Sequence, residues 1–453
     1  MTNKAVIEWL EIILNEYFGL PFLIDNSKSD ELCVTLPSQI GMIKFDMLQQ
    51  LFFSEGATLP CVQWGPESEK FNSILGFRSL PMPGNDSLPC PLIEQINYNH
   101  VIHYDILGLV YWMLSRQEEV GRQDLDKHGR FPATSSHAYK HKYLDRPIVD
   151  EWLNILGQVI NRQWPKLQLK QHQPQLFVSC DVDRPYLPYS KSFLLTLKTL
   201  MGDLAIRKSS QLAINNVRRY FLFRLGRYEL DPLMSAIEWI MHVNEKAGNK
   251  VAFYFITEQN GSIYNGCYAM DEGIIQYLLR RIHSSGHEIG LHGSYNSFND
   301  REKIISEANV LRKTKYIAGV SQVEIGGRQH YLRWETPETA RNLEAAGVVY
   351  DASLGYADRP GFRCGTCHEF RMFDPIKGEM LSIRQRPLVL MESSVISSIY
   401  MGLGYTDESI SYMSELKQRC YKVGGNFSLL WHNSHLMTDE DKTFYLSLIG
   451  NEV

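Results

Sequence analysis

The sequence lacks the features that would mark a membrane-spanning, exported or nucleic-acid-binding protein. Its 453 residues contain no apolar run of about 18, the length that a spanning helix needs. Glu8, Glu11 and Glu16 interrupt the apolar residues near the N-terminus, whereas a signal peptide has an unbroken apolar core. The formal net charge of −5 gives no general attraction for nucleic acid. We therefore expect a cytoplasmic protein that does not bind nucleic acid.

Cysteine is scarce: the sequence has eight, scattered along the chain. Their spacing predicts no disulfide framework. One segment, "CGTCH" from Cys364 to His368, has the spacing of covalent haem attachment or of half a zinc site. A zinc ribbon would need a second pair of cysteines, and the sequence has none. A redox pair is a further alternative, and the Gly-rich surroundings favour ordinary loop residues.

Common catalytic motifs are also missing. The sequence has no G-x-S-x-G nucleophile motif, no P-loop and no G-x-G-x-x-G after a strand. It also has no internal repeat and no low-complexity tract. A serine hydrolase, a nucleotide hydrolase or a dinucleotide-binding enzyme therefore has no local signature here.

The length of the chain suggests two or three domains. The polar, Gln-rich segment "NRQWPKLQLKQHQPQ", residues 161–175, marks a boundary between them. We expect a smaller mixed α+β domain over residues 1–165, with helices near its N-terminus and at 104–119 and 146–164. The polar loop between the last two, residues 124–147, is interpreted as a solvent-exposed connection, although such a loop can also contact a ligand.

From residue 175 onward, β-rich runs alternate with amphipathic runs. Strands are expected at 175–183, 250–258, 287–293, 324–334 and 426–434, and helices at 271–286, 300–316, 336–347 and 407–425. Thr336 and Gly347 are expected to cap the helix at 336–347. This alternation predicts an α/β fold with a parallel sheet or barrel over residues 175–453.

Four of the expected strands end in polar residues, "SCDVD", "LHGSYN", "GGRQHY" and "LLWHN". In parallel α/β folds the chemistry gathers at the carboxyl ends of the strands. These endings supply aspartate, histidine, arginine and histidine in turn. Together they predict an active site.

The first ending carries Asp181 and Asp183, which point to the same side of a strand because they are two residues apart. Two adjacent carboxylates repel unless a cation lies beside them. One carboxylate together with a histidine suits a divalent metal, and the second carboxylate can then act as a base. A pair that merely caps or shapes a turn is the alternative.

The second ending, "LHGSYN", contains one of the two histidines of its expected strand. His287 and His292 are five apart and project to opposite faces of one strand, so they do not form a pair. Asn296 is better placed than His287 to bind a metal together with His292, because it lies one helical turn after it. An amide oxygen, however, binds zinc more weakly than imidazole does. His330 shares a strand face with Arg328. Three interpretations stay open for it: a further metal ligand, a donor to the substrate, or a buried core histidine.

At these residues the chain resembles the polysaccharide deacetylases, the NodB-homology domain of carbohydrate esterase family four. The resemblance covers roughly residue 175 to the C-terminus. It implies Asp181 as general base, Asp183 and His292 as metal ligands, and Asn296 at the position of the family's second histidine. His432 in "LLWHN" matches the general acid of the family.

The third motif of the family matches "GGRQHY". Arg328 takes the position of its arginine, which would pair with Asp181, and the backbone N–H of Tyr331 would bind the oxyanion. His330 replaces the usual proline. Trp334 and Trp431 lie next to these motifs and are expected to contact the substrate.

The resemblance implies a distorted, incomplete (β/α) barrel that binds a divalent metal, zinc by preference, and removes the acetyl group from an N-acetylated sugar of a polysaccharide or its precursor. The segments "YDILGLVYWMLSRQEE" and "DKHGRFP" are similar to an uncharacterised domain that precedes such deacetylases in some bacterial proteins. Two alternatives stay open: an inactive carbohydrate-binding relative, favoured by Asn296, and a hydrolase of another C–N amide bond.

A long insertion, residues 184–250, contains the basic and aromatic segment "NNVRRYFLFRLGRYEL". A packed helix with a charged rim is the ordinary interpretation. The alternative is contact with a membrane or a lipid-linked glycan.

Overall fold

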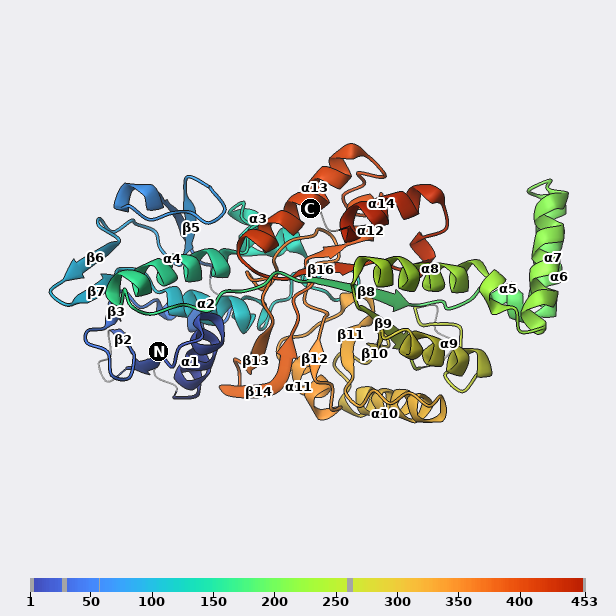
Figure 1. The fold of residues 1–453 in the computed structure, drawn as a ribbon, viewed down its shortest axis with the longest axis horizontal. Helices are drawn as coiled ribbons and strands as arrows, with labels where there is room; N and C mark the ends of the chain where they lie inside the picture. The colour runs from blue at the N-terminus through green and yellow to red at the C-terminus, as the bar shows by residue number, and fades with distance from the viewer. Residues whose placement is uncertain (1–3, 27–30, 57, 259–263, 451–453) are drawn as a thin grey trace.

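The computed structural model describes residues 4–26, 31–56, 58–258 and 264–450. The chain forms two groups of elements that share no sheet, one up to residue 163 and one from residue 176 (Figure 1). The first group has a five-stranded sheet, β1-β2-β3-β7-β6, and a two-stranded sheet, β4-β5. Its elements are α1 (Lys4–Phe18), β1 (Leu23–Asp25), β2 (Leu32–Thr35), β3 (Ile43–Phe45), β4 (Cys61–Trp64), β5 (Leu80–Pro83), β6 (Ile93–Ile96), β7 (Asn99–Ile102), α2 (Ile106–Leu114), α3 (His137–Lys140) and α4 (Ile148–Gln163).

The second group is a nine-stranded sheet with helices around it, in the order β13-β14-β12-β11-β10-β9-β8-β16-β15. Its strands are β8 (Leu176–Val182), β9 (Val251–Ile256), β10 (Glu288–Gly293), β11 (Gly326–Gln329), β12 (Tyr350–Asp351), β13 (Phe370–Asp374), β14 (Glu379–Gln385), β15 (Leu390–Met391) and β16 (Phe427–Leu430). Its helices are α5 (Pro188–Lys191), α6 (Phe193–Ala205), α7 (Ser210–Arg224), α8 (Pro232–Ala247), α9 (Gly273–Ser284), α10 (Arg301–Ile317), α11 (Glu338–Ala345), α12 (Glu392–Ile396), α13 (Asp407–Lys422) and α14 (Asp439–Ile449).

All neighbouring strands of this sheet run parallel except β13 and β14, which are antiparallel. The predicted α/β fold with a parallel sheet is therefore confirmed. β9, "VAFYFI", is buried at every position, as expected for a strand covered on both faces. The carboxyl ends of β8, β10, β11 and β16 consequently meet at one edge of the sheet.

Local sequence signals set the helix ends. Asp231 caps α8 because its Oδ1 accepts the N–H groups of Leu233 and Met234, and Pro232 occupies the first turn. The helix ends at Gly248, whose φ of 76° is left-handed. The amphipathic helix at the N-terminus and the helices expected after residue 271 are likewise present as α1, α9, α10, α11 and α13.

Two local predictions are corrected. The strand expected at 324–334 ends at Gln329, because Tyr331 and Leu332 adopt left-handed φ values of 62° and 55° that a strand does not accommodate. Thr336 does not cap α11, since Pro337 holds that position and the Thr336 hydroxyl instead accepts the indole N–H of Trp334 at 3.0 Å.

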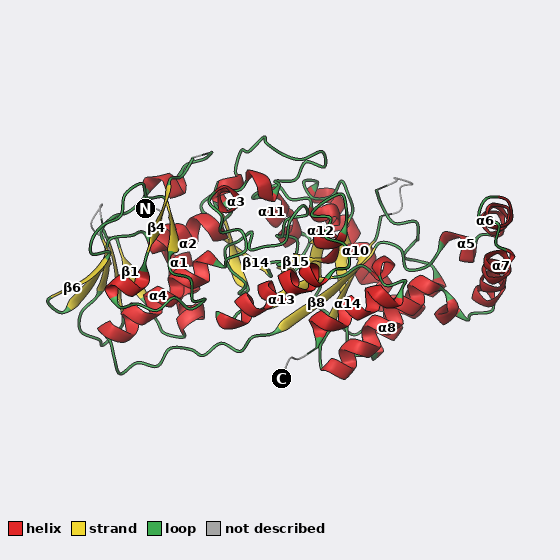
Figure 2. Cartoon of the chain, turned by 90° about the horizontal axis from the view of Figure 1, so that it is seen from above, coloured by secondary structure: helices red, strands yellow, loops and turns green. Residues whose placement is uncertain are grey.

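The apolar core runs through both groups of elements without a break. Trp9 of α1, for example, packs against Phe373 of β13, with ring centroids 5.1 Å apart and the rings tilted by 37°. The indole N–H of Trp9 also donates to the carbonyl of Arg371 at 2.8 Å. The N-terminal elements thus cover one end of the nine-stranded sheet (Figure 2).

At the opposite end of the molecule, α6 and α7 project away from the body as a helical hairpin (Figures 1 and 2). Among the described residues, no helix has both the length and the apolar character needed to cross a bilayer.

Candidate active site

The carboxyl edge of the sheet brings most of the sequence-predicted site residues into one cavity of about 380 Å³. β8 supplies the two aspartates, β10 a histidine, and the turn after β11 a second histidine. β16 is followed by a third. The residues from this set that line the cavity are Asp181, Asp183, His292, His330, Tyr331 and His432.

Asp183, His292 and His330 form a group whose potential ligand atoms all lie within 4.8 Å of one another. Asp183 Oδ1 is 3.4 Å from His292 Nε2 and 3.4 Å from His330 Nε2. The three residues come from different elements, so only the fold brings them together.

These positions fit a divalent metal. A tetrahedral zinc ion with bonds of about 2.1 Å sets its ligand atoms about 3.4 Å apart. Asp183 Oδ1 and His292 Nε2 are buried and have no hydrogen-bond partner in the described part of the chain. His292 Nδ1 lies 2.9 Å from the carbonyl oxygen of Arg328, which requires the proton on Nδ1 and leaves the lone pair of Nε2 free to bind a metal.

The charges in this group act on each other. Burial would raise the pKa of Asp183, but the neighbouring His330, His292 and His432 lower it well below its ordinary value. Burial would lower the pKa of His292, and Asp181 and Asp183 raise it instead. Asp183 is therefore ionised at neutral pH, as a metal ligand must be.

Asp181 lies beside this group rather than within it. Its Oδ2 is 3.5 Å from His292 Nε2, and its Oδ1 is 3.3 Å from Nε of Arg328. Arg328 is held in place by Ser179, whose hydroxyl accepts its Nη2–H at 2.8 Å, and by the ring of Tyr254 below it. The predicted pairing of Arg328 with Asp181 is therefore present.

His432 faces the same cavity, with its Nε2 4.0 Å from Asp183 Oδ2. Its Nδ1 lies 2.6 Å from Oε1 of Glu392, and Nδ1 of His435 lies 2.7 Å from the same oxygen. Burial would lower the pKa of His432, but Glu392 and the two aspartates raise it to about 10. His432 therefore carries a proton on both nitrogens at neutral pH.

Glu392 was missed in the sequence. It follows the short strand β15 and is fully buried, and its Oε2 is one of the unpartnered buried atoms of the described residues. The available signal was a carboxylate at the end of the apolar run "LVLM", the same pattern that marked the four other strand ends.

Asn296 lies outside the metal group. Its side chain is exposed, and its Oδ1 accepts a hydrogen bond from Nη1 of Arg333 at 3.3 Å. His330 therefore takes the third place in the group, one of the alternatives left open in the sequence. His287 stays apart as predicted, because its Nδ1 instead accepts the N–H of Val251.

Trp334 and Trp431 do not line the cavity, contrary to the expectation that they contact the substrate. Both are buried in the core. The indole N–H of Trp431 donates to the carbonyl of His435, so this side chain packs beneath the site. The aromatic side chains that do line the cavity are Tyr264, Tyr331 and Tyr400.

The loop at residues 124–147 reaches this cavity from the N-terminal group of elements. Asp126 Oδ1 accepts the N–H groups of His128 and Arg130 at 2.8 and 3.0 Å, which folds the loop into a tight turn. Arg130 lines the cavity and donates from Nη1 to the carbonyl of Tyr331 at 2.9 Å. The interpretation of this loop as a solvent-exposed connection is therefore wrong.

The turn after β11 is further held by Arg333, which donates to the carbonyls of His128 and Tyr295 at 2.8 and 2.6 Å. Tyr331 itself adopts a left-handed conformation, with φ 62° and ψ 11°. A residue other than glycine adopts this conformation only when its surroundings impose it. Here the contacts that impose it come from both groups of elements, through Arg130 and Arg333.

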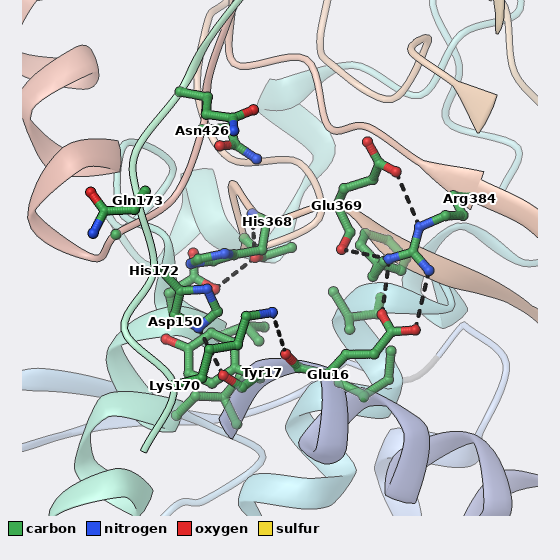
Figure 3. A pocket seen from close by; sticks show the side chains of 18 of the residues that line it. Glu16, Tyr17, Asp150, Lys170, His172, Gln173, His368, Glu369, Arg384 and Asn426 are labelled. Atoms are coloured by element: carbon green, nitrogen blue, oxygen red, sulfur yellow. Dashed lines mark hydrogen bonds and ion pairs between the residues drawn. The ribbon is translucent and has the colours of Figure 1, made fainter. Parts of the chain in front are cut away.

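A second cavity, of about 510 Å³, lies at the amino ends of β8 and β16 and is shown in Figure 3. Its charged groups are already paired. Arg384 contacts Glu16 and Glu369, and Lys170 donates to the carbonyl of Glu16. Because α/β enzymes place their chemistry at the carboxyl edge, we assign the candidate active site to the smaller cavity.

Cys364 and Cys367 are both buried and unoxidised. The Cys367 thiol packs against Asp150, and the ring of His368 contacts those of Tyr17 and His172, which also contact each other. The "CGTCH" segment thus forms part of the packing between the two groups of elements, in agreement with the favoured interpretation as loop residues.

Comparison with known proteins adds little. Residues 6–165 match a family of unknown function (DUF7033). The chain is similar to a solved structure described as a "putative polysaccharide deacetylase from Mycobacterium smegmatis", with 16% sequence identity and a TM-score of 0.37 over 62% of this chain and 86% of that one. No curated protein matches the sequence. The functional conclusion therefore depends on the geometry of the site.

Proposed function

We propose that the protein is a metal-dependent hydrolase that removes the acetyl group from an N-acetylated sugar. The observation that supports this most directly is the placement of Asp181 beside the Asp183–His292–His330 group, with protonated His432 in the same cavity. This set contains a metal site, a base and an acid. Those are the three components that hydrolysis of an unactivated amide needs.

The metal ligands are Asp183, His292 and His330. Two imidazoles and a carboxylate favour zinc among the common divalent ions. When bound, this ion would supply Lewis acidity toward the amide carbonyl and the attacking water.

The residues of the chain perform the remaining steps. Asp181 accepts the proton of the attacking water, and Arg328 keeps Asp181 oriented through their ion pair. The backbone N–H of Tyr331 donates toward the carbonyl oxygen as negative charge develops there. His432 gives its Nε2 proton to the departing amine nitrogen, while Glu392 holds the ring through Nδ1. Acetate and the free amino sugar are the products.

The proposal extends to the architecture. We propose that the nine-stranded sheet is an incomplete (β/α) barrel of the NodB-homology type over residues 175–453. A smaller mixed α+β domain over residues 1–165 precedes it. The open order of the sheet from β13 to β15 and the site at its carboxyl edge support this assignment.

The test is acetate release from N-acetylglucosamine oligomers by purified full-length protein, with and without added zinc, beside a panel of cyclic amides. We expect zinc-stimulated acetate release, lost in Asp181→Asn while the metal content is retained. Loss of metal in that variant would make Asp181 a ligand. Turnover of cyclic amides alone would favour the other amide hydrolase, and absence of both metal and turnover would favour the inactive relative.

A further inference from the structure

The α6–α7 hairpin exposes apolar side chains and buries polar ones, the reverse of the usual distribution. Eight apolar residues along it are each more than half exposed, namely Phe193, Leu194, Met201, Leu204, Ile206, Ile214, Phe221 and Leu225. The buried positions between the helices are instead mostly polar or small. Exposed apolar surface of this extent on a soluble protein marks a binding surface.

Polar contacts hold the hairpin together from inside. Asp203 is fully buried and accepts a hydrogen bond from Nδ2 of Asn216 at 2.7 Å. Thr196 is buried as well, and its hydroxyl donates to the carbonyl of Tyr189 at 2.6 Å. Ala213 and Phe223 are the buried apolar residues of α7. The hairpin is thus fixed in shape without using its leucines, isoleucines and methionine.

The hairpin is also strongly basic. Residues 188–230 contain eight lysines and arginines and two acidic residues, a net charge of +6 in a chain whose total is −5, so the remainder carries −11. Lys198, Lys208, Arg218 and Arg224 are exposed and have no acidic partner among the residues that the structure describes. The positive charge is therefore available to an anionic partner.

A shallow apolar groove of about 400 Å³ lies between the two helices, and its lining includes Leu200, Leu204, Ala213, Ile214 and Val217. α6 has 13 residues, a length of roughly 20 Å at the usual rise, which is well short of the hydrocarbon thickness of a bilayer. Helices of this kind, apolar and basic but too short to span, lie in the interface of a membrane.

We propose that the α6–α7 hairpin docks the protein on an anionic membrane surface. Its leucines, isoleucines and methionine enter the headgroup and acyl boundary, and its lysines and arginines bind lipid phosphates. A second copy of the chain is the less favourable occupant, because two copies of the segment 188–230, each of net charge +6, repel each other. α5 begins five residues after Asp183, so the hairpin leaves the body beside the carboxyl end of β8, where the candidate site lies. Docking would therefore hold the catalytic cavity close to the membrane.

The experiment is co-sedimentation of full-length protein with vesicles of phosphatidylcholine alone and of phosphatidylcholine mixed with phosphatidylglycerol. We expect binding to the mixed vesicles only, decreasing as salt is raised because the interaction is partly electrostatic. Met201→Glu/Leu204→Glu and Lys208→Glu/Arg218→Glu should each weaken binding by about tenfold or more.

The matched control is Ile40→Glu/Val323→Glu, because both residues are more than four-fifths exposed but lie far from the hairpin in the sequence. This variant should bind as the unmodified protein does, and thermal unfolding checks that all variants are folded. Equal binding to neutral vesicles, no binding to either, or binding unchanged in the hairpin variants would overturn the proposal. Sedimentation velocity showing a dimer that Met201→Glu/Leu204→Glu dissociates would overturn it also, by assigning the surface to a second copy.

Discussion

Arg130 Nη1 donates a hydrogen bond of 2.9 Å to the carbonyl oxygen of Tyr331, joining residues 201 positions apart in the sequence. Arg130 is itself fixed by Asp126, whose Oδ2 accepts its Nε–H at 2.8 Å. Tyr331 is the residue whose left-handed backbone shapes the turn after β11. The N-terminal elements therefore contribute a residue to the candidate active site and contact the turn that follows β11.

The first prediction concerns this contact. Arg130→Ala should lower kcat by about tenfold to a hundredfold, because the turn loses the contact at the Tyr331 carbonyl that fixes the backbone of this residue, and with it the direction of the Tyr331 N–H. Metal content should not change, since Arg130 contacts none of the proposed ligands. The control is Arg122→Ala, two residues before that loop, which removes an ion pair with Asp124 and should leave turnover unaltered. Equal losses in both variants would show a general effect of the loop rather than a role of the Tyr331 contact.

The second prediction separates the two candidates for the third metal ligand. His330→Ala should lose most of its bound zinc, because Nε2 of His330 lies 3.4 Å from Asp183 Oδ1, within the ligand group. Asn296→Ala should keep its zinc, because Oδ1 of Asn296 accepts a hydrogen bond from Arg333 and Asn296 is exposed and does not line the cavity. Elemental analysis of the purified variants measures both. Loss of zinc in Asn296→Ala alone would return the ligand role to the amide.

The strand ends that carry Asp181, His292, Arg328 and His432 were predictable from the sequence, because an apolar run followed by reactive residues is a local pattern. The exact role of His330 was not. A strand through residue 334 placed it on one face with Arg328, but the chain leaves the strand at Gln329. That departure depends on left-handed tyrosine and leucine, which residue preferences disfavour and tertiary contacts impose.

Contacts between distant segments could not be predicted at all. The loop containing Arg130 looks like a polar surface connection because nothing within its own sequence indicates where the chain will return. Glu392 follows a strand of two residues, too short to show any periodicity. Its one local signal is the carboxylate at the end of the apolar run "LVLM". The partners of both residues depend on packing between distant segments, which a single sequence does not reveal.

The third prediction concerns pH. Glu392 raises the pKa of His432, which is about 10. A general acid must be protonated, so activity should persist into the alkaline range. Glu392→Gln removes the largest of the charges that raise the pKa of His432, and leaves burial opposed only by the two aspartates. The alkaline limb of the kcat profile should therefore move down by two or more pH units.

The control for this experiment is His435→Gln, which removes the other histidine bound to Glu392 and should move the limb by less than about one unit. An unchanged limb in Glu392→Gln would exclude His432 as the group that sets it. The raised pKa also has a consequence for stability. This contribution is fully present below pH 6.5, the ordinary value for histidine, and is lost as the pH rises through about 10.

The last prediction concerns the buried ion pairs between the two groups of elements. Glu119 accepts hydrogen bonds from Nε and Nη2 of Arg363 at 2.8 and 2.7 Å, and from Nε of Arg116 at 3.0 Å. All three side chains are buried. Burial would raise the pKa of Glu119, but Arg363 and Arg116 outweigh it and lower the pKa from 4.5 to about 2.

Glu119→Gln should therefore lower the free energy of unfolding by about 3–5 kcal/mol at neutral pH, because it leaves the buried guanidinium of Arg363 without its counter-charge and that of Arg116 with Glu118 alone. In the unmodified protein this stabilisation is fully present above pH 4.5 and is lost as the pH falls through about 2. The variant should lack that acid-dependent loss.

Urea denaturation at neutral pH and at about pH 3 measures both effects, with Glu8→Gln as the control. Glu8 forms an exposed pair with Lys4, and its loss should cost less than about 1 kcal/mol. Similar losses in the two variants would mean that the buried network does not hold the N-terminal elements to the sheet.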